Sequence, residues 1–225
     1  MTAGHQLRRI ASGAYRRIDR NSTWGLGWKR QGEFVTFEWG GFVAAPSISM
    51  LFARHHYETT IIRRLLADKG VKRSLELGCG FGRLTPTFAS LSQEHLAIDI
   101  NTEALGAASS AYPQLHFQYY DGGALPFDDG AFDLVASWTV VQHIRPTMID
   151  ATLRELLRVL APRGRALLCE ETREPGAPTR HSWHRAPSFY EDHLRPLRLT
   201  YSSYIEEIDK LPGCVSPGRV MLFEP

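Results

Sequence analysis

The clearest structural signal in the sequence is the stretch Ser74-Leu75-Glu76-Leu77-Gly78-Cys79-Gly80-Phe81-Gly82-Arg83. An apolar run that ends near Glu76 is followed by three glycines, separated from one another by single residues. This order predicts a buried strand, a tight turn and a helix that begins near Arg83. Glycine permits positive φ and lets a ligand contact the bare backbone. The G-x-G-x-G spacing differs from the G-x-G-x-x-G of nicotinamide and flavin sites, so the turn indicates a different ligand.

Strand and helix patterns alternate along the chain from residue 72 onward. We expect strands at 73–77, 95–100, 115–120, 132–138, 165–170, 197–205 and 219–223. Helices are expected at 84–91, 102–111, 147–160 and 188–194, and a long loop at 172–187. This alternation predicts an α/β fold with a doubly wound, mostly parallel seven-stranded sheet and helices on both of its faces.

Residues 1–50 differ from the rest of the chain. Apolar residues at helical spacing between arginines predict a short amphipathic helix over 5–19. Aromatic residues and glycines alternate over 21–49 without a clear period, which predicts a loop-rich segment that packs against another part of the protein. A further helix is expected over 50–69, ended by Gly70. We therefore divide the chain into a basic, helical and aromatic N-terminal extension at 1–50 and a ligand-binding domain at 51–225.

Charge is distributed unevenly over a chain whose net charge is only +2. Residues 1–30 carry seven basic side chains and one acidic side chain. They predict a solvated arm or, as an alternative, a docking site for RNA or another anionic surface. No apolar run is long enough to span a membrane and no signal-peptide core is present, so we expect a cytoplasmic protein. The three cysteines lie far apart and form no C-x-x-C pair, which indicates neither a disulfide framework nor a zinc site.

Three expected strands end in carboxylates. Ligands of doubly wound sheets bind at these carboxyl ends, so Glu76, Asp99 and Asp121 are candidate binding residues. A carboxylate at Asp99 can accept hydrogen bonds from both ribose hydroxyls; its alternative role is a helix N-cap, which Asn101 or Thr102 serves better. Asp121 can accept a hydrogen bond from an exocyclic amine such as that of adenine, and its alternative role is an Asx turn with the glycines that follow.

This sequence resembles the class I S-adenosylmethionine-dependent methyltransferases. Their first signature is an acidic residue followed by G-x-G-x-G, which matches the stretch from Glu76 to Gly82. Residues 125–135, LPFDDGAFDLV, are similar to the family's segment before its fourth strand. Residues 160–165 are similar to its LKPGG turn, although Arg163 replaces the first of the two usual glycines. The resemblance is close over about residues 72–171.

The resemblance implies a Rossmann-like methyltransferase fold, S-adenosyl-L-methionine as cofactor and no metal. The glycine turn of this family passes under the methionine part of the cofactor, and the acids after the second and third strands meet ribose and adenine. Carried over by position, the implied cofactor-binding residues are Glu76, Gly78, Cys79, Gly80, Gly82, Arg83, Asp99, Ile100, Asp121, Gly122, Ser137 and Trp138.

His143 follows the fourth expected strand, near the place where the resemblance puts the transferable methyl group. A hydroxyl acceptor needs a base, and histidine titrates in the useful range. His143 is therefore the candidate catalytic residue; its alternative role is a structural hydrogen bond at the start of the next helix. The family often has Glu-His-Ile here, and Gln142 departs from that pattern.

We expect methyl transfer to a small-molecule acceptor at oxygen or nitrogen, with residues 24–42 and 172–187 forming the acceptor pocket. Two alternatives stay open: methylation of RNA, protein or a cell-envelope glycan, and a non-catalytic subunit that only binds S-adenosylmethionine. No Asn-Pro-Pro-Tyr or Pro-Cys follows the fourth strand, which argues against a DNA-base enzyme. The sequence leaves the acceptor and the oligomeric state open.

Overall fold

The computed structural model describes residues 27–31, 34–38, 42–45, 48–173, 175–176, 182–214 and 216–225. The helix expected over 5–19 and most of the basic arm lie outside the described residues. Among the described residues, no helix is long and apolar enough to cross a membrane.

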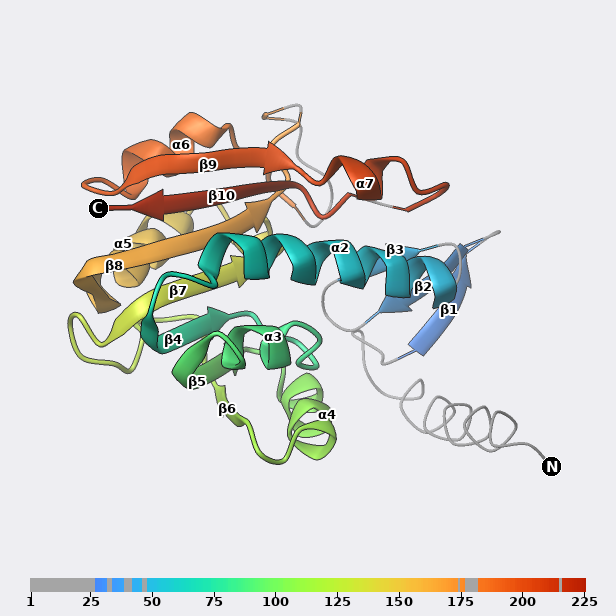
Figure 1. Ribbon diagram of the computed structural model, residues 1–225, viewed down its shortest axis with the longest axis horizontal. Helices are drawn as coiled ribbons and strands as arrows, with labels where there is room; N and C mark the ends of the chain where they lie inside the picture. Colours follow the sequence, from blue (N-terminus) through green and yellow to red (C-terminus); the bar gives the residue numbers. More distant parts are fainter. Residues whose placement is uncertain are drawn as a thin grey trace.

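A seven-stranded sheet forms the centre of the protein (Figure 1). Its order is β6(His116–Tyr119), β5(Ser92–Asp99), β4(Val71–Leu77), β7(Phe132–Trp138), β8(Leu160–Glu170), β10(Arg219–Glu224) and β9(Arg198–Tyr204). The pairs from β6 through β8 are parallel, whereas β10 runs antiparallel to both of its neighbours. The predicted fold class is confirmed. The strand order reverses between β4 and β7, and the carboxyl ends of these two strands define the place where such folds bind ligands.

Helices cover both faces of this sheet (Figure 1). On one face, α5(Ile149–Val159) and α6(Pro187–His193) bury Leu153, Leu156 and Tyr190 in one hydrophobic cluster. On the other face, α2(Ile48–Leu66), α3(Thr85–Ala89) and α7(Glu206–Asp209) contribute to a second cluster that includes Ile62 and Phe88. The helix α4(Thr102–Ala111) covers the β5 and β6 edge. Strand β7 serves both clusters because its successive side chains point to opposite faces.

A small antiparallel sheet precedes α2 and corrects the expectation of a loop-rich segment. It contains β1(Gly27–Gln31), β2(Phe34–Glu38) and β3(Phe42–Ala45) in that order. The sequences FVTFE and FVAA are rich in aromatic and β-branched residues, which favour strands. Each strand has only four or five residues, too few to show a clear period within a glycine-rich segment. Helix α2 begins at Ile48 and therefore crosses the predicted division after residue 50.

The largest boundary difference from the sequence prediction is in β8, and two short helices were not expected. Strand β8 begins at Leu160, not at residue 165, because Leu160 already pairs with Phe132 of β7. The short helices η1(Val141–His143) and α7 were not expected, since elements this short have no sequence period. The former lies directly after β7 and helps to form the site.

Candidate active site

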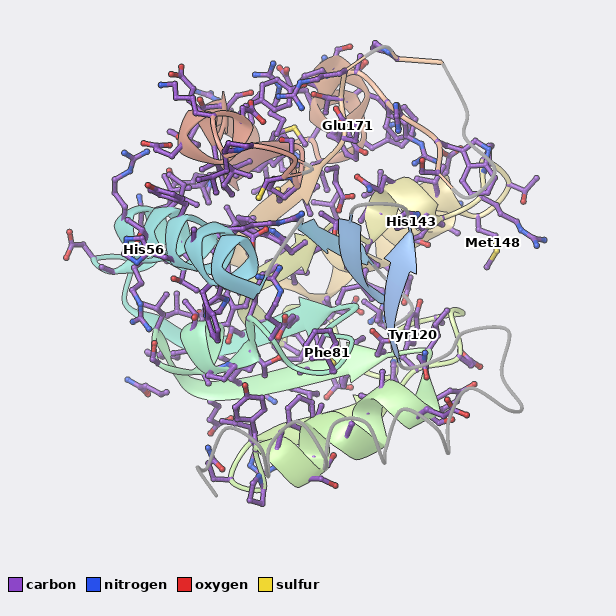
Figure 2. All side chains as sticks on the ribbon, turned by 90° about the vertical axis from the view of Figure 1, so that its right-hand side faces the viewer. His56, Phe81, Tyr120, His143, Met148 and Glu171 are labelled. Carbon is purple, nitrogen blue, oxygen red and sulfur yellow. The ribbon has the colours of Figure 1, made fainter. Side chains whose placement is uncertain are left out.

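A cavity of about 330 Å³ lies at the carboxyl ends of β4, β5 and β7. Figure 2 views this edge of the sheet, with Phe81 and Tyr120 below and His143 and Met148 above. The residues that line the cavity are Glu76, Leu77, Gly78, Cys79, Gly80, Phe81, Arg83, Leu84, Asp99, Ile100, Tyr120, Gly122, Trp138, Thr139, Val140, His143, Ile144, Arg145, Met148 and Thr152. Most of the predicted site residues therefore surround one cavity; Gly82, Asp121 and Ser137 do not line it.

The glycine turn needs glycine for two different reasons. Gly78 has φ +77°, and a Cβ added there would lie 2.3 Å from Cγ2 of Val140, so the Val140 side chain already occupies the space of a Cβ. Gly80 has φ +55°, and an added Cβ would meet nothing within 4 Å. Gly80 therefore leaves open space beside the turn, and it lines the cavity. Gly82 instead packs near Phe117 and Ala108, away from the cavity lining.

Asp99 lies at the end of β5 with both carboxylate oxygens directed at backbone. The Gly80 N–H donates to Oδ2 at 2.7 Å, and the Asn101 N–H donates to Oδ1 at 2.8 Å. Asn101 is the N-cap of α4, as expected, because its side chain accepts from the N–H groups of Glu103 and Ala104. Burial raises the pKa of Asp99. Each carboxylate oxygen has a second lone pair, so Asp99 can still accept two hydroxyl groups from a ligand.

Asp121 lies at the rim and not in the lining. Its Oδ1 accepts from the Gly123 N–H at 2.9 Å, which is the Asx-turn arrangement, and the residue is exposed. Its neighbours Tyr120 and Gly122 line the cavity. A role for Asp121 toward an adenine amine therefore stays a prediction.

Glu76 belongs to a buried polar network beneath the glycine turn. Its Oε2 accepts from the Thr85 hydroxyl at 2.6 Å and faces Nε2 of His95 at 3.4 Å. Nδ1 of His95 lies 2.7 Å from the Ser74 hydroxyl. Because the network fixes Glu76 from behind, its carboxylate is held in the cavity wall.

A second buried network joins α2 to the glycine turn. The completely buried carboxylate of Glu58 pairs with Arg54 at 3.0 Å and with Arg83, and it accepts from Trp138 Nε1 at 3.2 Å. Burial alone would raise the pKa of Glu58, but Arg83 and Arg54 lower it to about 2. Sequence analysis missed Glu58; the four-residue spacing from Arg54 was the only local signal. Arg83 and Trp138, both predicted cofactor residues, are held by this carboxylate.

The turn after β7 forms the opposite wall. Thr139 has φ 59°, a left-handed conformation that β-branched residues rarely adopt, and its N–H donates to the Cys169 carbonyl at 2.7 Å. Ser137 is completely buried and donates to Oε1 of Glu170 at 3.3 Å, so it supports this wall from outside the cavity.

His143 faces the cavity beside Gln142. The Glu171 N–H donates to Oε1 of Gln142 at 2.6 Å, which fixes the orientation of the amide. The amide nitrogen therefore lies on the other side, 3.3 Å from Nε2 of His143. Since an amide nitrogen only donates, Nε2 is the acceptor, and a neutral His143 carries its proton on Nδ1.

Comparison with known proteins supports one family. Residues 75–164 match the family described as "Methyltransferase domain". A demethylmenaquinone methyltransferase from Beutenbergia cavernae is 31% identical over 141 residues, which are 62% of this chain and 56% of that protein. A chloroplastic tocopherol O-methyltransferase from Arabidopsis thaliana is 31% identical over 128 residues, 52% of this chain and 36% of that protein. The chain thus spans about half the length, or less, of the curated relatives it matches.

Solved structures share the fold. An S-adenosylmethionine-dependent methyltransferase from Mesorhizobium loti has a TM-score of 0.59 at 17% identity, covering 75% of this chain and 98% of that one. A phosphoethanolamine N-methyltransferase from Haemonchus contortus, solved with phosphoethanolamine and S-adenosylhomocysteine, has a TM-score of 0.67 at 16% identity. It covers all of this chain and 50% of that chain.

These comparisons support a class I S-adenosylmethionine-dependent methyltransferase family for this chain.

The cavity fits S-adenosylmethionine, the cofactor that the resemblance implies. Open space beside Gly80 leaves the backbone accessible, and the Asp99 oxygens have lone pairs to spare for ribose. Ile100 and Tyr120 supply apolar surface on the same side, where adenine would lie. No group of His, Cys, Asp and Glu suited to a metal ion occurs in the described part of the chain. The residues therefore match S-adenosylmethionine in shape and in donor chemistry.

Proposed function

We propose that this methyltransferase transfers the methyl group of S-adenosylmethionine to an oxygen or nitrogen of a small molecule. The observation that carries the proposal is the continuity of one cavity. It runs from the glycine turn and Asp99 to a second end formed by His143, Ile144 and Met148. The first end suits the cofactor, and the second end offers an acceptor apolar surface together with the side chains of His143 and Arg145.

The residues of the chain act mainly by positioning, because the bound cofactor already supplies an electrophilic methyl group on its sulfonium. Asp99 and the Gly80 backbone orient the cofactor from the β4 and β5 side. The walls exclude water and align the acceptor atom for in-line attack, which accounts for most of the acceleration expected of such a site. Arg83, held by Glu58, lies in the same wall as Glu76.

His143 is the proposed base for a hydroxyl acceptor. Its Nε2 lone pair faces the Gln142 amide across 3.3 Å, a long hydrogen bond. An acceptor hydroxyl can replace this amide donor and lose its proton to Nε2. An amine acceptor that releases its proton to solvent needs no such base.

The small antiparallel sheet is the proposed cover of the acceptor end. In both views β1, β2 and β3 lie beyond the carboxyl edge of the large sheet (Figures 1 and 2). Two curated relatives are named for small acceptors, demethylmenaquinone and tocopherol, which favours a small molecule over a polymer. We place the reaction in the cytoplasm. The three cysteines are free thiols, which is the state that a reducing compartment maintains.

A labelled-methyl transfer screen tests the proposal. The purified protein is incubated with S-adenosylmethionine carrying a tritiated methyl group and with separated small-molecule, RNA and protein fractions of its host. We expect label in the small-molecule fraction. Label in RNA or protein would favour the macromolecular alternative, in which the basic residues of 1–30 dock the substrate. Tight binding of S-adenosylhomocysteine without transfer to any fraction would favour a non-catalytic subunit.

A further inference from the structure

Glu170 is a completely buried carboxylate that holds the turn after β7. It is the last residue of β8 and does not line the cavity. Its carboxylate accepts from three successive backbone N–H groups, those of Val140 at 3.4 Å, Val141 at 3.1 Å and Gln142 at 2.9 Å. The Ser137 hydroxyl adds a fourth donor at 3.3 Å. One side chain therefore accepts from three successive N–H groups in the middle of the turn.

This turn touches both ends of the cavity. Val140 packs directly on Gly78 of the glycine turn, where no room exists for a Cβ. His143 lies three residues further along, in the acceptor end. Between β7 and these residues, Thr139 adopts a left-handed conformation that contacts from its surroundings must hold in place. A small displacement of the turn would therefore move the cofactor wall and the candidate base together.

We propose that Glu170 is a positioning residue whose ionised carboxylate holds residues 139–143 in the conformation that binds the cofactor and presents His143. The proposal rests on the active site proposed above. Only an ionised carboxylate offers acceptors alone; a protonated acid or an amide turns one of its two polar atoms into a donor. In the amide, at least one N–H of the turn faces a donor and loses its acceptor; in the acid, the protonated oxygen accepts more weakly and its own proton lies among donors.

The surroundings make the charge of Glu170 sensitive to pH. Burial raises the pKa of Glu170 to about 7, although the hydrogen bonds from the turn act to lower it. Tyr190 of α6 interacts electrostatically with both Glu170 and Arg185, and Cys169 is the neighbour of Glu170 on β8. Arg185 donates to the carbonyls of Val141 at 3.1 Å and Ile144 at 2.7 Å, so it holds the other side of the same turn. Above neutral pH Glu170 is ionised and the turn is held; below it the hold weakens.

Calorimetric titration with S-adenosylhomocysteine between pH 6 and 8.5 tests this role in Glu170→Gln. We expect wild-type affinity to rise through about pH 7 to a plateau. The variant should bind about tenfold more weakly at pH 8, the equivalent of one lost hydrogen bond, with the pH-dependent rise removed. Glu171→Gln is the matched control: the adjacent carboxylate accepts from the Arg173 N–H at 2.7 Å outside the cavity, and this variant should follow wild type.

Binding by Glu170→Gln within about twofold of wild type at pH 8 would overturn the proposal, because a lost positioning bond is expected to cost about tenfold. If the variant fails to fold, amide hydrogen exchange of the wild-type protein provides the test of the proposal instead. Protection of the amides of residues 140–142, corrected for intrinsic rate, should fall between pH 8 and pH 6, and unchanged protection would overturn the proposal. Wild-type protein that does not bind S-adenosylhomocysteine at all would instead refute the cofactor site itself.

Discussion

Asp99 carries the clearest single-residue test of the cofactor site. Asp99→Ala removes the acceptor for the proposed ribose hydroxyls. It also removes the acceptor of the Gly80 and Asn101 N–H groups. We expect S-adenosylhomocysteine to bind more weakly by about 1.5–3 kcal/mol, as for hydrogen bonds to a charged group. Calorimetry measures the loss. Asp128→Ala, which removes an exposed carboxylate outside the cavity lining, is the control and should bind like wild type; equal affinities for the two variants would remove Asp99 from the site.

His143 tests the base and the class of acceptor at the same residue. With a hydroxyl acceptor, His143→Ala should lower turnover by about 10²–10⁴-fold and leave cofactor affinity unchanged, since the side chain lies at the acceptor end. Steady-state kinetics with the acceptor found by the screen provide the measurement. A loss of less than about threefold, against the hundredfold expected of a base, would make His143 structural and favour an acceptor that needs no base.

At the scale of elements, Gly78 and Gly80 of the glycine turn should respond differently to substitution. An added side chain at Gly78 would collide with Val140, so it should disturb the fold around both turns. At Gly80 an added side chain meets open space, and the left-handed φ of +55° costs about 1–2 kcal/mol. Gly80→Val should therefore remain folded by circular dichroism yet lose cofactor binding in calorimetry. A folded variant with wild-type affinity would place the ligand elsewhere.

Helix α2 contributes a buried charge pair whose loss should be costly. Glu58→Gln removes the buried carboxylate that pairs with Arg54 and Arg83, and it should lower the free energy of unfolding by about 3–5 kcal/mol in urea titrations. The control is Glu94→Gln, which breaks an exposed pair with Arg73 and should cost less than about 1 kcal/mol.

The Glu58 carboxylate also makes the stability of the fold depend on pH in a definite direction. Its pKa is lowered from 4.5 to about 2 in the fold, so ionised Glu58 stabilises the protein above about pH 4.5. This contribution is lost as pH falls from 4.5 toward 2, and the loss should be smaller in Glu58→Gln. Parallel acid-unfolding curves for the two proteins would show that Glu58 does not carry the charge pair.

Over the whole molecule, the features that could be predicted from the sequence are those that depend on residues close together in the chain. Strand ends, the glycine turn and the Asn101 cap were all readable because each depends on neighbouring residues. Glu58 and Glu170 were not predicted, since their partners other than Arg54 lie 25 or more residues away along the chain, among them Arg83 and the turn after β7. The small sheet of β1 to β3 was missed for another reason: its strands are too short to establish a period.

Ligand binding should also be visible in the stability of the whole fold. The cavity joins the glycine turn, the ends of β4 and β5, and the turn after β7, so a bound cofactor favours the folded chain over the unfolded one. At a concentration one hundred times its Kd, S-adenosylhomocysteine should add about 2.7 kcal/mol. For a chain of this size that corresponds to a rise in Tm of about 5–10 °C. NAD should give no rise, because the G-x-G-x-G turn departs from the spacing that dinucleotide sites use. Differential scanning calorimetry with each ligand separates the two outcomes, and a shift with NAD alone would refute the assignment of the cavity to S-adenosylmethionine.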